Sequence, residues 1–115
     1  MISNPTQLID LLNKLPSQIR DQEKVFILSK EVLDLDKLTL SVAKANSILK
    51  STGNATEKNA QAVRDTEVEA IGLIHTQKKT DLEEAQLKYL ENKFTSLRKI
   101  STIETELIRT QLTGV

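Results

Sequence analysis

Between residues 25 and 49, mostly apolar positions recur at alternating steps of three and four residues. This spacing places them along one side of an α-helix and is the heptad pattern of helices that pack along their length. We therefore predict a long helix over residues 17–50. Its seam positions are Val25, Leu28, Val32, Leu35, Thr39, Val42, Asn46 and Leu49.

Thr39 and Asn46 are the two polar members of this seam. An amide at a seam position lowers stability but penalises other registers and other numbers of partner helices. One interpretation is that Asn46 controls the register. The other is that it is simply exposed near the fraying end of the helix, and both interpretations stay open.

A second periodic segment spans residues 66–112 without a proline. At 1.5 Å per residue it predicts a helix roughly 65 to 75 Å long. Its apolar residues form two neighbouring stripes, which are wider than a single partner helix covers, so we expect a third helix or a second chain to bury the remainder. A homo-oligomer, dimer or higher, is the expected result. The residues expected to carry self-association are Leu90, Phe94, Leu97, Ile100, Ile103 and Leu107.

The first sixteen residues predict a short separate helix. Asn4 before Pro5 is a good helix start, because the asparagine side chain can cap free amides and a first-turn proline loses no hydrogen bond. Pro16 is expected to end this helix. The prediction is a short helix over residues 5–15, followed by the first long helix.

Residues 51–65, STGNATEKNAQAVRD, lack a clear apolar repeat and are expected to form the tip of an antiparallel hairpin. The register that pairs the most apolar positions places Leu28 opposite Leu90, Leu35 opposite Leu82 and Leu49 opposite Val68. A short helical turn is expected around Thr56 to Arg64. Loops on rigid scaffolds often carry binding residues, so this tip is a candidate partner contact. The candidate residues are Asn54, Glu57, Lys58 and Arg64.

Composition supports one all-α domain: a long antiparallel, coiled-coil-like helical hairpin with a short N-terminal helix, assembling into an oligomeric helical bundle. Only 3% of the residues are aromatic, and three glycines and two prolines interrupt the chain. Sixteen basic and sixteen acidic residues cancel, so the net charge predicts no strong attraction to nucleic acid or membrane. The lack of cysteine and of a signal or membrane-spanning pattern indicates a cytoplasmic protein.

The sequence offers no convincing catalytic, cofactor or metal site. His75 is the only histidine, and a Glu-x-x-His metal motif would need a carboxylate where Gly72 stands. Gly53 lies in no phosphate-binding motif and is expected to cap a helix C-terminus. Asn54 begins a glycosylation pattern that has meaning only in a secreted chain. We therefore expect a protein that is not an enzyme.

Basic and aromatic residues alternate in LKYLENKFTSLRK, residues 87–99. Such a segment can contact the phosphates and bases of a single strand. On a helix, however, these cations do not form one clean stripe. Nucleic-acid contact is therefore the alternative hypothesis, through Lys88, Lys93, Arg98 and Lys99.

Two short stretches, TGNATEKNAQA and LKYLENKFTSLRKI, resemble a loose group of small helical proteins encoded by bacteriophages and prophages near early recombination and replication genes. The resemblance covers residues 40–100. Asn59 departs from the charged residue expected there. The matching positions are Gly53, Asn54 and Ala55, then Leu90, Glu91, Phe94, Leu97 and Arg98.

This resemblance implies a phage accessory protein that acts on another macromolecule. It would either assist DNA recombination and replication or inhibit a host protein such as a defence factor. A single-stranded nucleic-acid-binding protein and a purely structural coiled-coil scaffold are the alternatives.

Overall fold

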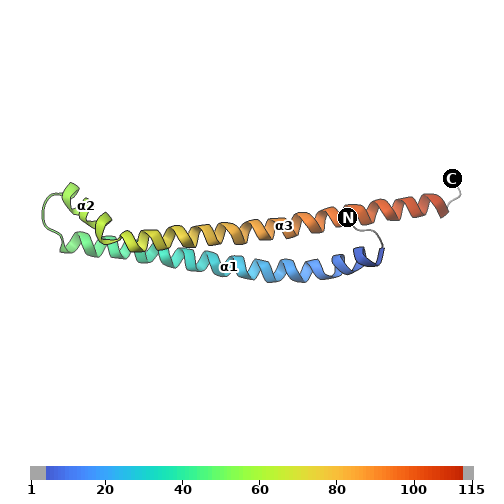
Figure 1. Cartoon of the computed structure of the whole chain (residues 1–115), viewed down its shortest axis with the longest axis horizontal. Coiled ribbons are helices and arrows are strands. Elements are labelled where there is room, and N and C mark those ends of the chain that lie inside the picture. Colours follow the sequence, from blue (N-terminus) through green and yellow to red (C-terminus); the bar gives the residue numbers. More distant parts are fainter. Residues whose placement is uncertain (1–4, 113–115) are drawn as a thin grey trace. The chain divides into compact units, whose positions relative to one another are not determined.

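The computed structural model describes residues 5–112, and these residues form three α-helices. Helix α1 spans Pro5–Lys50, α2 spans Ala55–Asp65 and α3 spans Glu67–Leu112 (Figure 1). Among the described residues there is no β-strand. The all-α prediction is therefore confirmed.

Pro16 lies inside α1 and does not end it, so the predicted short helix over residues 5–15 is wrong. An internal proline removes one backbone hydrogen bond and costs about 3 kcal/mol in a helix. The buried side of α1 nevertheless keeps its heptad spacing across Pro16, from Leu12 and Leu15 to Ile19. Packing of this continuous side offsets the local cost and keeps the two segments in one helix.

The chain divides into two compact units, where the sequence indicated a single domain. Unit 1 consists of Met1–Lys24 and Glu84–Val115, and unit 2 consists of Val25–Glu83. Within each unit, a part of α1 and a part of α3 run side by side in opposite directions (Figure 1). The antiparallel pairing predicted from the sequence is thus present in both units.

Unit 1 has a leucine core. Leu8, Leu15 and Leu97 are buried, and Leu15 is completely inaccessible to solvent. These side chains lie on the two facing sides of α1 and α3, where removal of apolar surface from water stabilises the contact. The partly buried residues that pack against this core are Leu11, Leu12, Leu90 and Phe94.

Unit 2 combines apolar contacts with hydrogen bonds between its helices. Thr80 Oγ1 lies 3.3 Å from the Ser29 carbonyl oxygen, Thr76 donates to Asp36, and Ser47 donates to Asp65 at 2.7 Å. Buried hydroxyl groups need such partners, because an unpaired one costs about 1 to 3 kcal/mol. In α1 the side that faces α2 and α3, called here the contact seam, consists of Phe26, Ser29, Leu33, Asp36, Leu40, Ala43 and Ser47.

The contact seam differs by one residue from the seam predicted from the sequence. One residue is a rotation of about 100° around a helix of 3.6 residues per turn. Leu35 and Leu82, expected opposite each other, are both exposed, and Asp36 bonds to Thr76 instead. The predicted pairing register is therefore wrong. Both stripes have heptad spacing, and the bonds that link the Asp36 and Ser47 side chains to Thr76 and Asp65 belong to the orientation that the structure adopts.

The connector between the long helices is itself helical, as predicted. Asn54 is the N-cap of α2, and its side-chain oxygen accepts a hydrogen bond from the Glu57 amide at 2.9 Å. Gly53 has a φ of 108°, a conformation that other residues rarely adopt. Gly53 follows the end of α1, which agrees with the prediction that this glycine caps a helix C-terminus.

Candidate interaction surface

The apolar heptad that the sequence singles out lies on the outside of unit 2. We call Val25, Leu28, Val32, Leu35, Thr39, Val42, Asn46 and Leu49 the outer seam. Its members are all exposed, with Leu28 at 60%, Leu35 at 62% and Leu49 at 83% exposure. Six large aliphatic side chains therefore project from one side of α1 without cover from their own chain.

A groove shows which part of α3 shares this side. Val25, Leu28 and Val32 line it from α1, while Lys79 and Glu83 are among its lining residues from α3. The groove has a volume of about 310 Å³. The outer seam therefore lies on the same side of unit 2 as Lys79.

Helical spacing extends this side along α3. Leu82 is three residues after Lys79, and His75 is four residues before it, so all three share one side of the helix. Val68 precedes His75 by seven residues, which is two turns. Leu82 and Val68 are 71% and 80% exposed. We define the apolar face as Val25, Leu28, Val32, Leu35, Val42 and Leu49 of α1 with Val68 and Leu82 of α3.

The opposite side of unit 2, called here the charged side, is mostly polar. In α3, Gln77 donates to Asp81 at 2.9 Å, and both residues are exposed. In α1 the polar and charged residues of this side each follow a contact-seam position by one, and they are Lys30, Asp34, Lys37, Ser41 and Lys44. Two exposed isoleucines, Ile27 and Ile74, also lie on this side by helical spacing. The charged side thus carries far fewer exposed aliphatic residues than the apolar face.

The apolar face is large in relation to the core of the protein. Among residues 6–111, five apolar residues are buried, whereas the apolar face alone contains eight large exposed ones. Scattered exposed leucines are normal in proteins, but contiguous apolar patches above a few hundred Å² mark binding sites. The apolar face is contiguous along α1 because its members follow each other at steps of three, four or seven residues. It is the main candidate surface for binding another polypeptide.

Asn46 lies exposed in the outer seam and outside the contact seam. An influence on register would therefore act on a chain that packs against the apolar face, and not on the pairing of α1 with α3. That influence stays a prediction.

The predicted tip contacts have mainly structural roles. Asn54 caps α2, the Glu57 side chain occupies the space that a Cβ at Gly53 would need, and Lys58 is half-buried. Arg64 is exposed and donates to Gln61 at 2.7 Å. Arg64 is also one of the residues around a polar groove of about 670 Å³ between the end of α1 and α2. Arg64 is therefore the tip residue most open to a partner.

Asp65 accepts two hydrogen bonds that lower its pKa. Ser47 Oγ donates at 2.7 Å, Gln61 Nε2 donates at 2.6 Å, and nearby Arg64 adds a favourable charge. These groups hold the pKa of Asp65 below its ordinary value of 3.8. Because the pKa of Asp65 is lower in the folded state, the ionised Asp65 carboxylate stabilises the fold above pH 3.8. This stabilisation disappears as the pH falls through the folded-state pKa.

Replacement of Ser47 by alanine is therefore expected to raise the pKa of Asp65 towards 3.8. The largest of the favourable interactions is removed, while Gln61 remains. NMR titration of the Asp65 carboxyl carbon measures this shift, with Ser41→Ala on the charged side as the control. An unchanged titration in Ser47→Ala would show that the hydroxyl does not bind the carboxylate in solution.

Unit 1 uses half of the residues predicted for self-association within its own chain. Leu97 is buried, and Leu90 and Phe94 are partly buried against Leu8 and Leu15. Leu97 is therefore used inside its own chain, whereas Leu90 and Phe94 keep part of their surface exposed, and their part in self-association stays a prediction. The other three, Ile100, Ile103 and Leu107, are exposed, and their part in self-association stays a prediction.

The four predicted nucleic-acid contacts lie in different surroundings on α3. Lys88 pairs with Glu84 at 2.9 Å, which raises the pKa of Lys88 above its ordinary value. Lys93 lies over the Tyr89 ring, 5.9 Å from its centre. Helical spacing places Lys93 on another side of α3 from Lys88. The sequence-based conclusion that these cations form no single stripe agrees with this placement.

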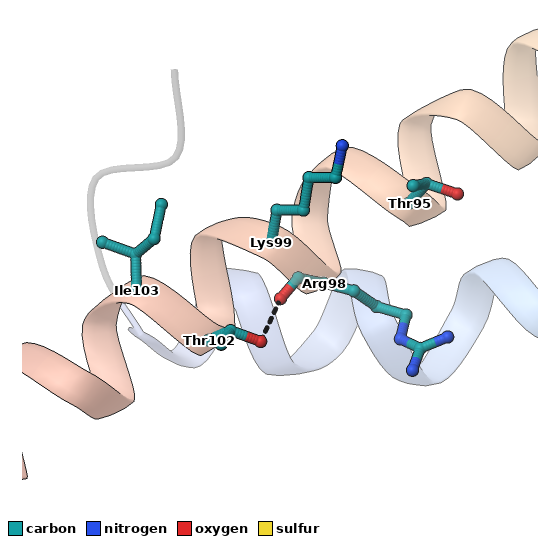
Figure 2. Close-up of a pocket in the computed structure, with 5 residues that line it drawn as sticks. All are labelled: Thr95, Arg98, Lys99, Thr102 and Ile103. Atoms are coloured by element: carbon teal, nitrogen blue, oxygen red, sulfur yellow. Dashed lines mark hydrogen bonds between the residues drawn. The ribbon is translucent and has the colours of Figure 1, made fainter.

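Arg98 and Lys99 lie beside a hollow of about 460 Å³ in unit 1 (Figure 2). Its lining residues all come from α3, and Thr102 donates to the Arg98 carbonyl oxygen at 3.0 Å. The Arg98 guanidinium lies 5.7 Å from the centre of the Phe94 ring. Two exposed cations on one helix are an ordinary solvated surface and are weak evidence for a phosphate site.

Within residues 5–112, no group of three or more histidine, cysteine, aspartate or glutamate side chains could hold a metal ion. Over the same range, the helices lack an apolar stretch long enough to cross a bilayer. His75 is exposed on the side of the apolar face.

The sequence analysis missed the contact seam, although its signal is visible. Phe26, Leu33, Leu40 and Ser47 recur every seven residues directly beside the predicted seam. Two adjacent heptad stripes on one helix predict two different packing partners. This pattern would have indicated that one stripe pairs within the chain and the other remains outside.

Comparisons with protein-family models, with curated proteins and with solved structures find no match to this chain.

Proposed function

We propose that this chain is a non-enzymatic interaction protein whose apolar face binds another polypeptide. The observation that supports this proposal is the exposed outer seam, with six large aliphatic residues on one side of α1. Leaving such side chains in water forgoes about 25 cal/mol for every Å² of apolar surface that a partner would cover. A covering polypeptide is the simplest source of that stabilisation.

Two further observations support contact with a polypeptide over contact with a small ligand. The groove beside Val25, Leu28 and Val32 has a volume of only about 310 Å³, and exposed apolar residues extend well beyond it to Leu49. A small-molecule site encloses most of its ligand in one cavity, and one cavity does not account for a stripe of this length. A long apolar stripe fits the side of another helix, which presents residues at the same spacing.

The proposed biological setting follows from the resemblance of residues 40–100 to phage and prophage helical proteins. In that setting the chain assists DNA recombination and replication proteins or inhibits a host protein such as a defence factor. The exposed Arg64 and the polar groove at the tip would then present polar side chains to the client.

Site-specific photo-crosslinking in the producing cell tests the proposal. A photoreactive residue at position 35, in the apolar face, is expected to form covalent adducts with a polypeptide. The same residue at position 41, on the charged side of the same helix, is expected to form few adducts. Equal yields at the two positions, or no polypeptide adduct at position 35, would refute the proposed binding face.

A further inference from the structure

The apolar face has the area of one side of a stable protein interface. It contains eight large aliphatic side chains with exposures between 41% and 83%. If each exposes on the order of 100 Å², the face presents roughly 800 Å², which is the area that each partner contributes to an interface of standard size. A much smaller occupant would leave part of the seam in water.

We propose that the occupant is a second copy of this chain, so that two copies of unit 2 bury their apolar faces against each other. This inference rests on the proposed function, since both require the face to bind a polypeptide. It adds the identity of that polypeptide.

Two residues are called level when they lie at the same height along the helix axes. Aliphatic residues of α1 are level with aliphatic residues of α3, and this makes the apolar face complementary to a second copy of itself. Ser29 lies level with Thr80, and Asp36 lies level with Thr76, because their groups bond across the unit. Counting along antiparallel helices from these pairs brings Leu28 level with Leu82, to within about one turn.

The same counting, from the bond between Thr76 and Asp36, brings Val42 level with residue 70 of α3, within about one turn of Val68. A twofold axis parallel to the helices does not shift these levels. It therefore sets α1 of each copy beside α3 of the other with aliphatic residues opposite aliphatic residues. The interface is isologous and closes as a dimer.

The polar members of the face also fit this arrangement. Thr39, the small polar residue in the middle of the outer seam, is level with Gly72, where an added Cβ would meet nothing within 4 Å. A glycine opposite a threonine permits close approach of two helices. Lys79 is level with Glu31, so a carboxylate of one copy lies near the cation of the other. Asn46 then occupies an interchain seam, where an amide favours one register.

Sedimentation velocity over a wide range of concentration tests the inference with the full chain. The wild-type protein is expected to reach twice the 12.9 kDa mass of one chain. Leu35→Glu places a charge in the interface and is expected to weaken dimerisation about 100-fold. Val42→Glu is expected to act in the same way from a second position.

Ser41→Glu is the matched control, because it adds the same charge to an exposed position on the charged side of α1. It is expected to leave the dimer intact. Circular dichroism should show the same helix content in all variants, since Leu35 and Val42 are exposed in the single chain. A dimer that survives both Leu35→Glu and Val42→Glu would overturn the inference.

A wild-type protein that remains a single chain at every concentration would also overturn it. If photo-crosslinks from position 35 to a different polypeptide persist in that case, the proposed function stands and only the identity of the occupant is wrong. If position 35 crosslinks to no polypeptide, both proposals fail.

Discussion

Leu15→Ala is expected to lower the free energy of unfolding by about 3 kcal/mol, because it leaves a cavity in the leucine core of unit 1. Leu15 is completely buried and belongs to the same cluster as Leu8 and Leu97. No neighbouring chain element replaces the lost methyl groups without moving a helix. Urea denaturation followed by circular dichroism measures the loss.

Ile9→Ala is the matched control for Leu15→Ala. Ile9 is on the same segment of α1 and is 56% exposed, so its truncation is expected to cost less than about 1 kcal/mol. Hydrogen exchange should locate the effect of Leu15→Ala in unit 1. Equal losses for the two variants would show that the leucine cluster does not hold α1 against α3 in solution.

Leu33→Ala is expected to destabilise the protein by about 2 to 4 kcal/mol, whereas Leu28→Ala is expected to cost less than about 1 kcal/mol. Leu33 is 6% exposed in the contact seam, and Leu28 is 60% exposed in the outer seam. Both substitutions remove the same atoms from the same helix. The difference therefore reports which stripe of α1 faces α3.

The comparison is best made in a Val42→Glu background, so that both variants are measured as single chains. Val42 is far enough along α1 from both leucines for the effects to add. Urea denaturation again gives the free energies. A larger loss for Leu28→Ala than for Leu33→Ala would mean that the seam predicted from the sequence is the true contact within the chain.

Helix positions were predictable because they depend on local properties of the chain. The absence of prolines between residues 17 and 112 and the repeat of apolar positions indicated two long helices, which α1 and α3 confirm over most of their length. The short helical turn expected around Thr56 to Arg64 is present as α2, and Asn54 caps its start by accepting a hydrogen bond from the Glu57 amide. The exception is Pro16, which was expected to end a helix. Packing of α1 against α3 outweighs the hydrogen bond that this proline removes.

The rotation of α1 was not predictable from apolar spacing alone. The contact seam and the outer seam differ by one residue and share the same alternation of three and four. The register that pairs the most apolar residues of the two helices uses the outer seam. The contact seam forms fewer apolar pairs because it contains Ser29, Asp36 and Ser47. In the structure the side chains of Asp36 and Ser47 bond to Thr76 and Asp65 across the unit, and the backbone carbonyl oxygen of Ser29 lies 3.3 Å from Thr80 Oγ1.

The sequence by itself determined that this protein is helical, that it doubles back near its middle and that it carries more apolar surface than one hairpin contact covers. Only the tertiary structure decided which stripe is inside, because the choice depends on hydroxyl and carboxylate partners far apart in the chain. A helix needs only its own residues to form its backbone hydrogen bonds, whereas the side-chain bond between Ser47 and Asp65 and that between Asp36 and Thr76 each need two helices. The tertiary contacts therefore leave the most apolar heptad of the chain exposed on unit 2.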